Sequence, residues 1–191
     1  MTEPIRQIDM LETARGQEEA DLVTAAQRDP QAFELLYLRY VQPVFRYLYS
    51  RIGNQAEAED ATAQTFLAAL EAFDHYHHDG HFAAWLFSIA RRKAADNFRS
   101  QQRQAPLEDA DSIPSGTDLL QGVIQTERKV ALTKLIAGLP EDERELIRLR
   151  YVAELSFSEI GRLLGCSEDA AKKSLYRLLA RLQSQLEVYH D

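Results

Sequence analysis

The sequence predicts an all-α protein of two small helical domains joined by a flexible acidic linker, the second domain containing a helix-turn-helix. Apolar residues recur at helical spacing along most of the chain, and alternating strand patterns are nearly absent. An acidic segment that contains several prolines and glycines interrupts this periodicity at residues 104–126. Beyond it, residues 156–182 have the pattern of two helices separated by a tight turn. We therefore expect an N-terminal arm at 1–17, a first domain at 18–103 and a second domain at 127–187.

The first domain is expected to consist of consecutive helices. They cover residues 21–27, 31–52, 55–73 and 82–102, with a loop at 74–81. Asp29-Pro30 and Gly53-Asn54 mark the boundaries between the first three helices, and Pro43 is expected to kink or locally loosen the second. For residues 1–17 the sequence leaves two structures open, a disordered arm and an additional helix. In the second domain, Pro140 is expected to be the first residue of a helix.

The helix-turn-helix is predicted from the residues around its turn. Ser156 and Glu159 have the spacing of a capping box at the start of the first helix. Gly165 stands where a left-handed helix cap is needed, and Ser167 can cap the second helix. We expect Cys166, which lies in the turn, to be a small buried packing residue.

The second helix of this motif has an apolar and a basic face. At about 100° per residue, one side collects Ala171, Leu175, Leu178, Leu179, Leu182 and Leu186. Lys173, Arg177 and Arg181 lie on the opposite side, flanked by Ser174 and Tyr176. This basic face is typical of a helix that enters the DNA major groove. The alternative is the solvated face of an ordinary amphipathic helix.

Charge is distributed unevenly along a chain whose net charge is −8. Residues 1–80 contain 14 acidic and 6 basic residues, whereas residues 81–105 contain one acidic residue and five basic ones: Arg91, Arg92, Lys93, Arg99 and Arg103. Local clusters decide nucleic-acid binding more than total charge does. On the helix predicted at 82–102, Arg92, Arg99 and Arg103 form a stripe that can neutralise phosphates, with Arg91 exposed elsewhere and a solvated face as the alternative. Trp85 of the same helix is expected in the core rather than as a platform for stacked bases.

No catalytic or cofactor site is predicted. The sequence shows no nucleophile–base set, glycine-rich phosphate loop or paired carboxylates, so we expect neither an enzyme nor a bound cofactor. His75, His77, His78 and His81 are expected to be solvated or DNA-contacting rather than metal ligands, because their spacing is that of a loop without cysteine. The chain contains no apolar run long enough to span a membrane and no secretory signal at its N-terminus, so a cytoplasmic location is expected.

Several blocks of the sequence resemble, in order and spacing, the bacterial RNA polymerase sigma factors of the extracytoplasmic-function (ECF) group of the sigma-70 family, which are built from regions two and four. The blocks in the first domain are DPQAFELLYLRYVQPVFRYLYSRI, AEDATAQTFLAAL and FAAWLFSIARRKAADNFRSQQR. The second domain contains LPEDERELIRLRYVAELSFSEIGRLLGCSEDAAKKSLYRLLARL, which has the shape of region four. The resemblance covers about residues 18–103 and 127–186.

The resemblance implies a protein that binds core RNA polymerase, recognises the minus-ten and minus-thirty-five promoter elements and promotes DNA opening at transcription initiation. It implies docking of the second domain on the flap of the second-largest polymerase subunit, and an anti-sigma factor as a further partner. It implies that the loop 74–81 and the helix from Phe82 read the minus-ten element, and that the helix after Ser167 reads the minus-thirty-five element. The minus-ten contacts are expected to be Arg91, Arg92, Arg99 and Arg103. The contacts with the clamp helices of the largest subunit are expected around Asp60, Gln64, Thr65, Phe66 and Leu67.

Two other functions fit parts of the sequence. A helix-turn-helix regulator that acts without core polymerase would explain the second domain, but it leaves the helix at 82–102 and the AEDATAQTFL segment without a role. A sigma-like decoy that binds an anti-sigma factor but not DNA is disfavoured by the basic residues on both helices. The sequence therefore favours a sigma factor.

Overall fold

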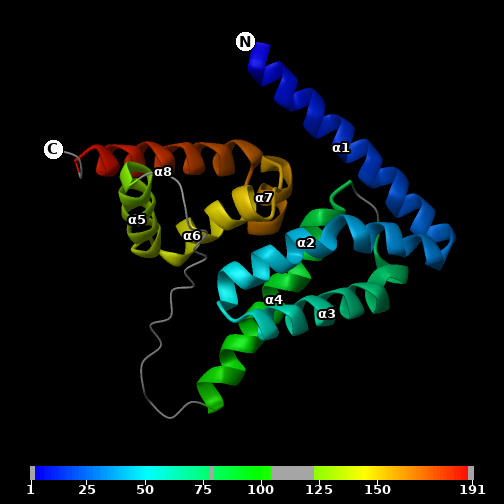
Figure 1. Ribbon diagram of the computed structural model, residues 1–191. Helices are drawn as coiled ribbons and strands as arrows, with labels where there is room; N and C mark the ends of the chain where they lie inside the picture. Colours follow the sequence, from blue (N-terminus) through cyan, green and yellow to red (C-terminus); the bar gives the residue numbers. More distant parts are fainter. Residues whose placement is uncertain (1–2, 78–79, 105–122, 189–191) are drawn as a thin grey trace.

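The computed structural model describes residues 3–77, 80–104 and 123–188, and the side chains of residues 16–77, 80–100 and 130–187. Every regular element in these ranges is a helix, which confirms the predicted all-α class (Figure 1). The main helices form two helical domains, α1 to α4 and α5 to α8. Most of the predicted linker at 104–126 lies outside the described residues, and α5 begins at Val123, within that range.

The first domain is built around three packed helices. These are α2 (Phe33–Ile52), α3 (Gln55–Ala72) and α4 (Phe82–Gln104), and α1 (Glu3–Arg28) packs against α2. Short 3₁₀ turns at Pro30–Ala32 and Phe73–His75 complete the domain. Its largest fully buried side chains are Leu36, Tyr47, Leu48, Phe82, Leu86 and Phe87. Trp85 packs against this core, as predicted.

The ends of these helices follow from local sequence. Gly53 ends α2 in the left-handed conformation with φ +80°, which glycine adopts without steric cost. Asn54 then caps α3, because its side chain accepts a hydrogen bond from the Glu57 amide at 3.1 Å. Asp29 caps the 3₁₀ turn in the same way through the Gln31 amide. Pro43 lies inside α2 without ending it.

Helix α1 is longer than the predicted helix at 21–27. It begins at Glu3 and so also includes most of residues 1–17, and its first turns extend beyond the other helices (Figure 1). Val23 and Ala26 are buried against the rest of the domain. This packing on α2 stabilises a helix whose own sequence shows only weak helical periodicity, since tertiary contacts supply most helix stability in proteins.

The second domain contains α5 (Val123–Ala137), α6 (Glu141–Ile147), α7 (Phe157–Leu164) and α8 (Glu168–Val188). Pro140 is the N-cap of α6 rather than its first helical residue. A π-helical turn, η3 (Arg148–Val152), follows α6 directly. Its end is closed by the Leu155 amide, which donates to the Leu149 carbonyl oxygen at 3.0 Å. The apolar spacing of the sequence does not distinguish this wider turn from an α-helix.

The two domains are packed against each other. Helix α7 contacts α4, and η3 contacts α2. Apolar side chains of both domains, Phe87 and Ala90 of α4 together with Leu149, Leu155 and Ile160, belong to one continuous buried cluster. Burial of apolar surface on both sides therefore stabilises a closed arrangement of the two domains.

Candidate nucleic-acid interface

The turn between α7 and α8 has the geometry that the sequence predicts. Ser156 and Glu159 form the capping box: the Glu159 amide donates to Ser156 Oγ (3.2 Å), and the Ser156 amide donates to Glu159 Oε2 (2.6 Å). Gly165 ends α7 with φ +71°. The Ala170 amide donates to Ser167 Oγ (3.2 Å) at the start of α8. These caps confirm the predicted helix-turn-helix.

The close approach of α7 and α8 depends on Gly161, which the sequence analysis did not single out. A Cβ atom added at Gly161 would lie 2.7 Å from the carbonyl oxygen of Cys166 and 3.1 Å from the Glu168 amide nitrogen. The Cys166 amide also donates to the Gly161 carbonyl oxygen at 2.9 Å. The Cys166 side chain is exposed, so the prediction that it is a buried packing residue is wrong. The backbone of Cys166, not its thiol, takes part in the tight packing.

Helix α8 presents the two predicted faces. Ala171, Leu175, Leu178 and Leu182 are buried. The predicted DNA contacts are all exposed: Lys173, Ser174, Tyr176, Arg177 and Arg181. The Tyr176 ring packs on Phe157 of α7, with 6.1 Å between the ring centroids, and Arg181 pairs with Glu143 of α6. The basic face is thus open to a macromolecular ligand and is held by the other helices of its domain.

The predicted DNA contacts of α4 have different surroundings. Arg92 donates to the Ser88 carbonyl oxygen (3.3 Å), and Arg99 pairs with Asp96 (3.3 Å), so both are exposed side chains that contact their own helix. Arg91 Nε instead lies 3.5 Å from Glu145 Oε1 of the second domain. The Arg103 side chain lies outside the described side chains. One of the predicted DNA contacts is therefore engaged between the domains.

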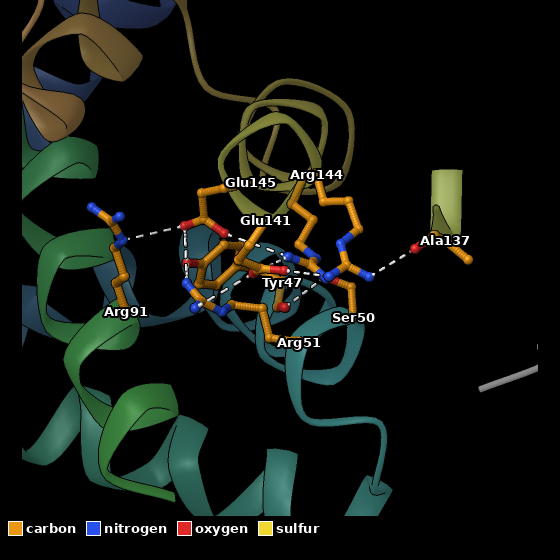
Figure 2. A network of polar contacts seen from close by, with 9 residues as sticks. Tyr47, Ser50, Arg51, Arg91, Ala137, Glu141, Arg144 and Glu145 are labelled. Atoms are coloured by element: carbon orange, nitrogen blue, oxygen red, sulfur yellow. Dashed lines mark hydrogen bonds and ion pairs between the residues drawn. The ribbon is translucent and has the colours of Figure 1, made fainter. Parts of the chain in front are cut away.

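Glu145 of α6 is the centre of a polar network between the domains (Figure 2). Its Oε1 accepts hydrogen bonds from Tyr47 Oη (2.6 Å) and Arg51 Nη1 (3.0 Å), both on α2, in addition to the contact with Arg91. Arg51 Nη2 also lies 3.7 Å from Glu141. The Glu145 residue is only 3% exposed. Sequence analysis missed this residue because its partners on α2 are more than 90 positions away along the chain.

The surroundings of Glu145 fix the protonation of its tyrosine partner. Burial, together with the nearby Glu145 carboxylate, raises the pKa of Tyr47 well above its usual range. Tyr47 therefore remains a hydrogen-bond donor at physiological pH.

Arg46 and Glu154 form a second polar contact between the domains, with 2.9 Å between Arg46 Nη2 and Glu154 Oε1. Both side chains are about half exposed, so water screens this ion pair.

The predicted polymerase-contacting residues of α3 are divided between surface and core. Asp60, Gln64 and Leu67 are exposed, and Leu67 retains 57% of its accessible area. Thr65 and Phe66 are buried: the Thr65 hydroxyl donates to the Ala61 carbonyl oxygen, and the Phe66 ring packs against Tyr37 with 4.9 Å between centroids. Exposed Leu38 on α2 and Leu70 on α3 add apolar surface in the same domain. The exposed part of the predicted docking surface is therefore Asp60, Gln64 and Leu67.

The histidine-rich segment before α4 is described in part. His75, His77 and His81 are within the structure, whereas His78 and Asp79 lie outside the described residues. In the part of the chain that is described, no three His, Cys, Asp or Glu side chains are grouped closely enough to hold a metal ion. Among the described helices, none combines the length and apolar character needed to cross a lipid bilayer.

Each of the two domains matches a known protein family model. A family model for Sigma-70 region 2 matches residues 36–104, and one for Sigma-70, region 4 matches residues 129–182. The chain is 33% identical over 177 residues to the ECF RNA polymerase sigma factor BldN of Streptomyces coelicolor, covering 90% of this chain and 66% of BldN. It is 31% identical over 154 residues to the ECF RNA polymerase sigma factor SigM of Bacillus subtilis, covering 78% of this chain and 91% of SigM.

Solved structures support the same fold. CnrH in complex with the cytosolic domain of CnrY superposes with a TM-score of 0.62 at 24% identity, covering 87% of this chain and 96% of CnrH. The sigma factor RpoE in complex with the anti-sigma factor NepR from Bartonella quintana gives a TM-score of 0.58 at 23% identity, covering 82% of this chain and 97% of RpoE.

Two helical domains with exposed basic helices, matched in order by the two sigma-70 regions, define the class of protein as a transcription initiation factor that binds DNA. The chain belongs to the extracytoplasmic-function group of the sigma-70 family. Its function is that of a sigma factor, which binds core RNA polymerase and recognises promoters. The family match to both domains disfavours a helix-turn-helix regulator that acts without polymerase.

Proposed function

We propose that the exposed face of α8 reads the minus-thirty-five promoter element and that α4, with the segment before it, reads the minus-ten element. On α8 the contacts are Lys173, Ser174, Tyr176, Arg177 and Arg181, and on α4 they are Arg91, Arg92, Arg99 and Arg103. One observation carries the proposal: exposed basic side chains lie on one helix in each of the two domains. Helix α8 has the dimensions and the polar face of a major-groove reader.

Core polymerase is proposed to dock on the first domain through Asp60, Gln64 and Leu67. Leu67 supplies exposed apolar surface, and the two polar side chains beside it supply hydrogen-bonding groups at the rim. Thr65 and Phe66 hold this surface in place from the core, because both are buried. The flap of the second-largest subunit is proposed to bind the second domain.

The closed arrangement of the domains has to open for this function. The minus-ten and minus-thirty-five elements are about 25 base pairs apart, which corresponds to about 85 Å at about 3.4 Å per base pair. Domains of this size have radii of gyration of about 12 Å, so two domains in contact cannot reach both elements at once. Opening also releases Arg91 from Glu145 and makes it available to phosphate. The Glu145 network therefore opposes promoter binding until polymerase or DNA separates the domains.

The remaining parts of the proposal concern organisation and partners. The two functional domains are taken as residues 18–103 and 127–187, preceded by an arm at 1–17 and joined by a linker at 104–126. The protein is proposed to work in the cytoplasm without cofactor and without catalytic activity of its own, since polymerase performs the chemistry. An anti-sigma factor is a proposed partner, in keeping with the sigma–anti-sigma complexes whose sigma chains share this fold.

Run-off transcription with purified core polymerase tests the proposal. The template carries a promoter located by mapping transcription start sites after overexpression of the protein. We expect core polymerase to initiate there only when the protein is added. The double variant Lys173→Ala/Arg177→Ala should reduce initiation at least tenfold, because each lost base or phosphate contact costs about 1–3 kcal/mol. Its affinity for core polymerase should not change.

A matched control separates base reading from loss of charge. The double variant Arg28→Ala/Lys134→Ala removes two exposed basic residues outside the proposed reading face and should transcribe as the unaltered protein does. Equal activity of both double variants would contradict the assignment of the α8 face. Initiation that does not depend on added protein would contradict the proposed function as a whole.

A further inference from the structure

Tyr176 is an aromatic residue on the exposed face of α8. It retains 55% of its accessible area, and it lies one turn after Lys173 and directly before Arg177 on the same helix. The other proposed DNA contacts of α8 end in polar or charged groups: Lys173, Ser174, Arg177 and Arg181. Tyr176 alone among them presents an aromatic ring, so it differs from its neighbours in what it can recognise.

The Tyr176 ring rests on Phe157, the first residue of α7. The two ring centroids are 6.1 Å apart and the ring planes cross at 61°, an edge-to-face arrangement that aromatic rings favour. Phe157 belongs to the buried apolar cluster and is only 7% exposed. One side of the Tyr176 ring is therefore supported by a buried ring, while more than half of the residue faces solvent.

Phe157 is itself held in place by two cations. The guanidinium carbon of Arg150 lies 4.5 Å from the centroid of the Phe157 ring, and Arg150 Nη1 donates to the Leu155 carbonyl oxygen at 2.8 Å. The Lys172 ammonium nitrogen lies 6.0 Å from the same centroid. Cations at these distances are attracted by the electron-rich face of an aromatic ring. These contacts fix the orientation of Phe157, which in turn limits the rotation of Tyr176.

A supported aromatic ring in the major groove is suited to recognise thymine. Thymine alone of the four DNA bases presents a C5 methyl group in this groove, and apolar side chains read that group by direct contact. A ring that is held in place before binding loses less conformational entropy when it makes the contact. The lysine and arginine side chains around Tyr176 donate hydrogen bonds to base acceptors instead, so the ring adds a different kind of readout.

We propose that Tyr176 determines promoter specificity by contacting the methyl group of one thymine in the minus-thirty-five element, and that Phe157 is the positioning residue for this contact. The inference rests on the proposed function, in which the exposed face of α8 reads that element. It adds the chemical group that is read, and it assigns a role to a buried residue outside the exposed face of α8.

Deoxyuridine substitution tests the methyl contact, since deoxyuridine pairs as thymidine does but lacks the C5 methyl group. Each thymine of the upstream element of the mapped promoter is replaced in turn, and the affinity of the full chain bound to core polymerase is measured by competition with the unaltered promoter. At one position the affinity should fall about fourfold, as expected for one methyl group that loses its contact. An element without thymine, or one in which no replacement has an effect, would overturn the proposal.

Three variants assign the effect to the Tyr176 ring. Tyr176→Ala should bring the ratio of the affinities for thymine and deoxyuridine to about one, whereas Tyr176→Phe keeps the ring and should retain a ratio of about four. Tyr151→Ala removes an equally exposed ring from η3 and should also retain the ratio. A ratio that persists in Tyr176→Ala, or that is lost in Tyr176→Phe or Tyr151→Ala, would overturn the methyl contact.

Phe157→Leu tests the positioning role, because leucine keeps an apolar side chain in the core but offers no ring to Tyr176. The affinity ratio should fall below about two, and in the Tyr176→Ala background the same change should leave the ratio at about one. Circular dichroism checks that each variant is folded. A merely structural role would weaken binding to both DNAs equally and leave the ratio at about four, and that result would overturn the role of Phe157.

The inference and the proposed function fail in different ways. If the unaltered protein does not direct core polymerase to the mapped promoter, the proposed function is contradicted, and this inference with it. If the protein does so, and Lys173→Ala/Arg177→Ala weakens binding as expected, a missing methyl effect contradicts the role of Tyr176 alone.

Discussion

Gly161 determines how closely the two helices of the helix-turn-helix approach. The atoms that a side chain would meet at this position belong to the backbone of Cys166 and Glu168, which cannot rotate away as a side chain could. The space exists only for a residue without Cβ. The packing of α8, the proposed DNA-reading helix, on α7 therefore requires a residue without Cβ at position 161.

Replacing Gly161 by alanine is expected to destabilise the second domain. Overpacking of this kind costs about 1–3 kcal/mol, and the better helix propensity of alanine offsets at most about 1 kcal/mol of it. For a domain of this size each kcal/mol lowers the melting temperature by about 4–8 °C. Thermal unfolding followed by circular dichroism checks the prediction.

Gly16 provides the matched control, because it is also a glycine inside a helix. No described atom lies within 4 Å of a Cβ added there, so Gly16→Ala should leave stability unchanged or raise it by up to about 1 kcal/mol. Equal melting temperatures for the Gly161→Ala and Gly16→Ala proteins would contradict the role assigned to Gly161.

Single residues could be predicted from the sequence where their partners are local. Ser156, Glu159 and Gly165 interact within a few positions, and the structure has them as the sequence indicates. Glu145 could not be found in this way, since its partner Tyr47 lies 98 positions away. Cys166 was assigned wrongly because residue size alone does not show which atoms of a turn are packed.

At the scale of helices, periodicity predicted the elements better than their ends. The helix from Phe82 and the two faces of α8 are present, because a continuous apolar stripe indicates both a helix and the face that it buries. Helix α1 extends further toward the N-terminus than predicted. The π-helical turn after α6, which contacts α2, was not predicted, since the apolar spacing of its sequence does not distinguish it from an α-helix.

At the scale of the whole molecule, the contact between the domains is the feature that the sequence could not indicate. It places buried polar groups, with Glu145 at their centre, within a shared apolar cluster. Linker composition predicted two domains but carries no information about whether their surfaces match. The contact engages one of the proposed DNA contacts, Arg91, in an ion pair with Glu145 of the other domain.

Replacing Glu145 by alanine is expected to separate the two domains from their closed arrangement. Glu145→Ala leaves Arg51 and Tyr47 without their buried acceptor, and losing one partner of a buried pair costs about 3–5 kcal/mol. Energy transfer between dyes attached at Glu59→Cys and Ser184→Cys, both exposed, should fall. The exposed Cys166 has to be replaced by serine first, because it would also be labelled.

The exposed Arg46–Glu154 pair serves as the control for this experiment. Both side chains are about half exposed, so Arg46→Ala should change the free energy difference between the closed and open arrangements by less than about 1 kcal/mol. A Glu145→Ala protein with the same energy transfer as the unaltered protein would show that the network does not hold the domains together.

The central claim, that one chain carries two promoter readers, is tested most directly by a DNase I footprint of the protein bound to core polymerase on its mapped promoter. The account predicts two protected elements about 25 base pairs apart. Lys173→Ala/Arg177→Ala should remove protection of the upstream element only, and Arg92→Ala/Arg99→Ala should weaken the downstream element only. Loss of both elements together in either variant, or a footprint identical to that of core polymerase alone, would contradict it.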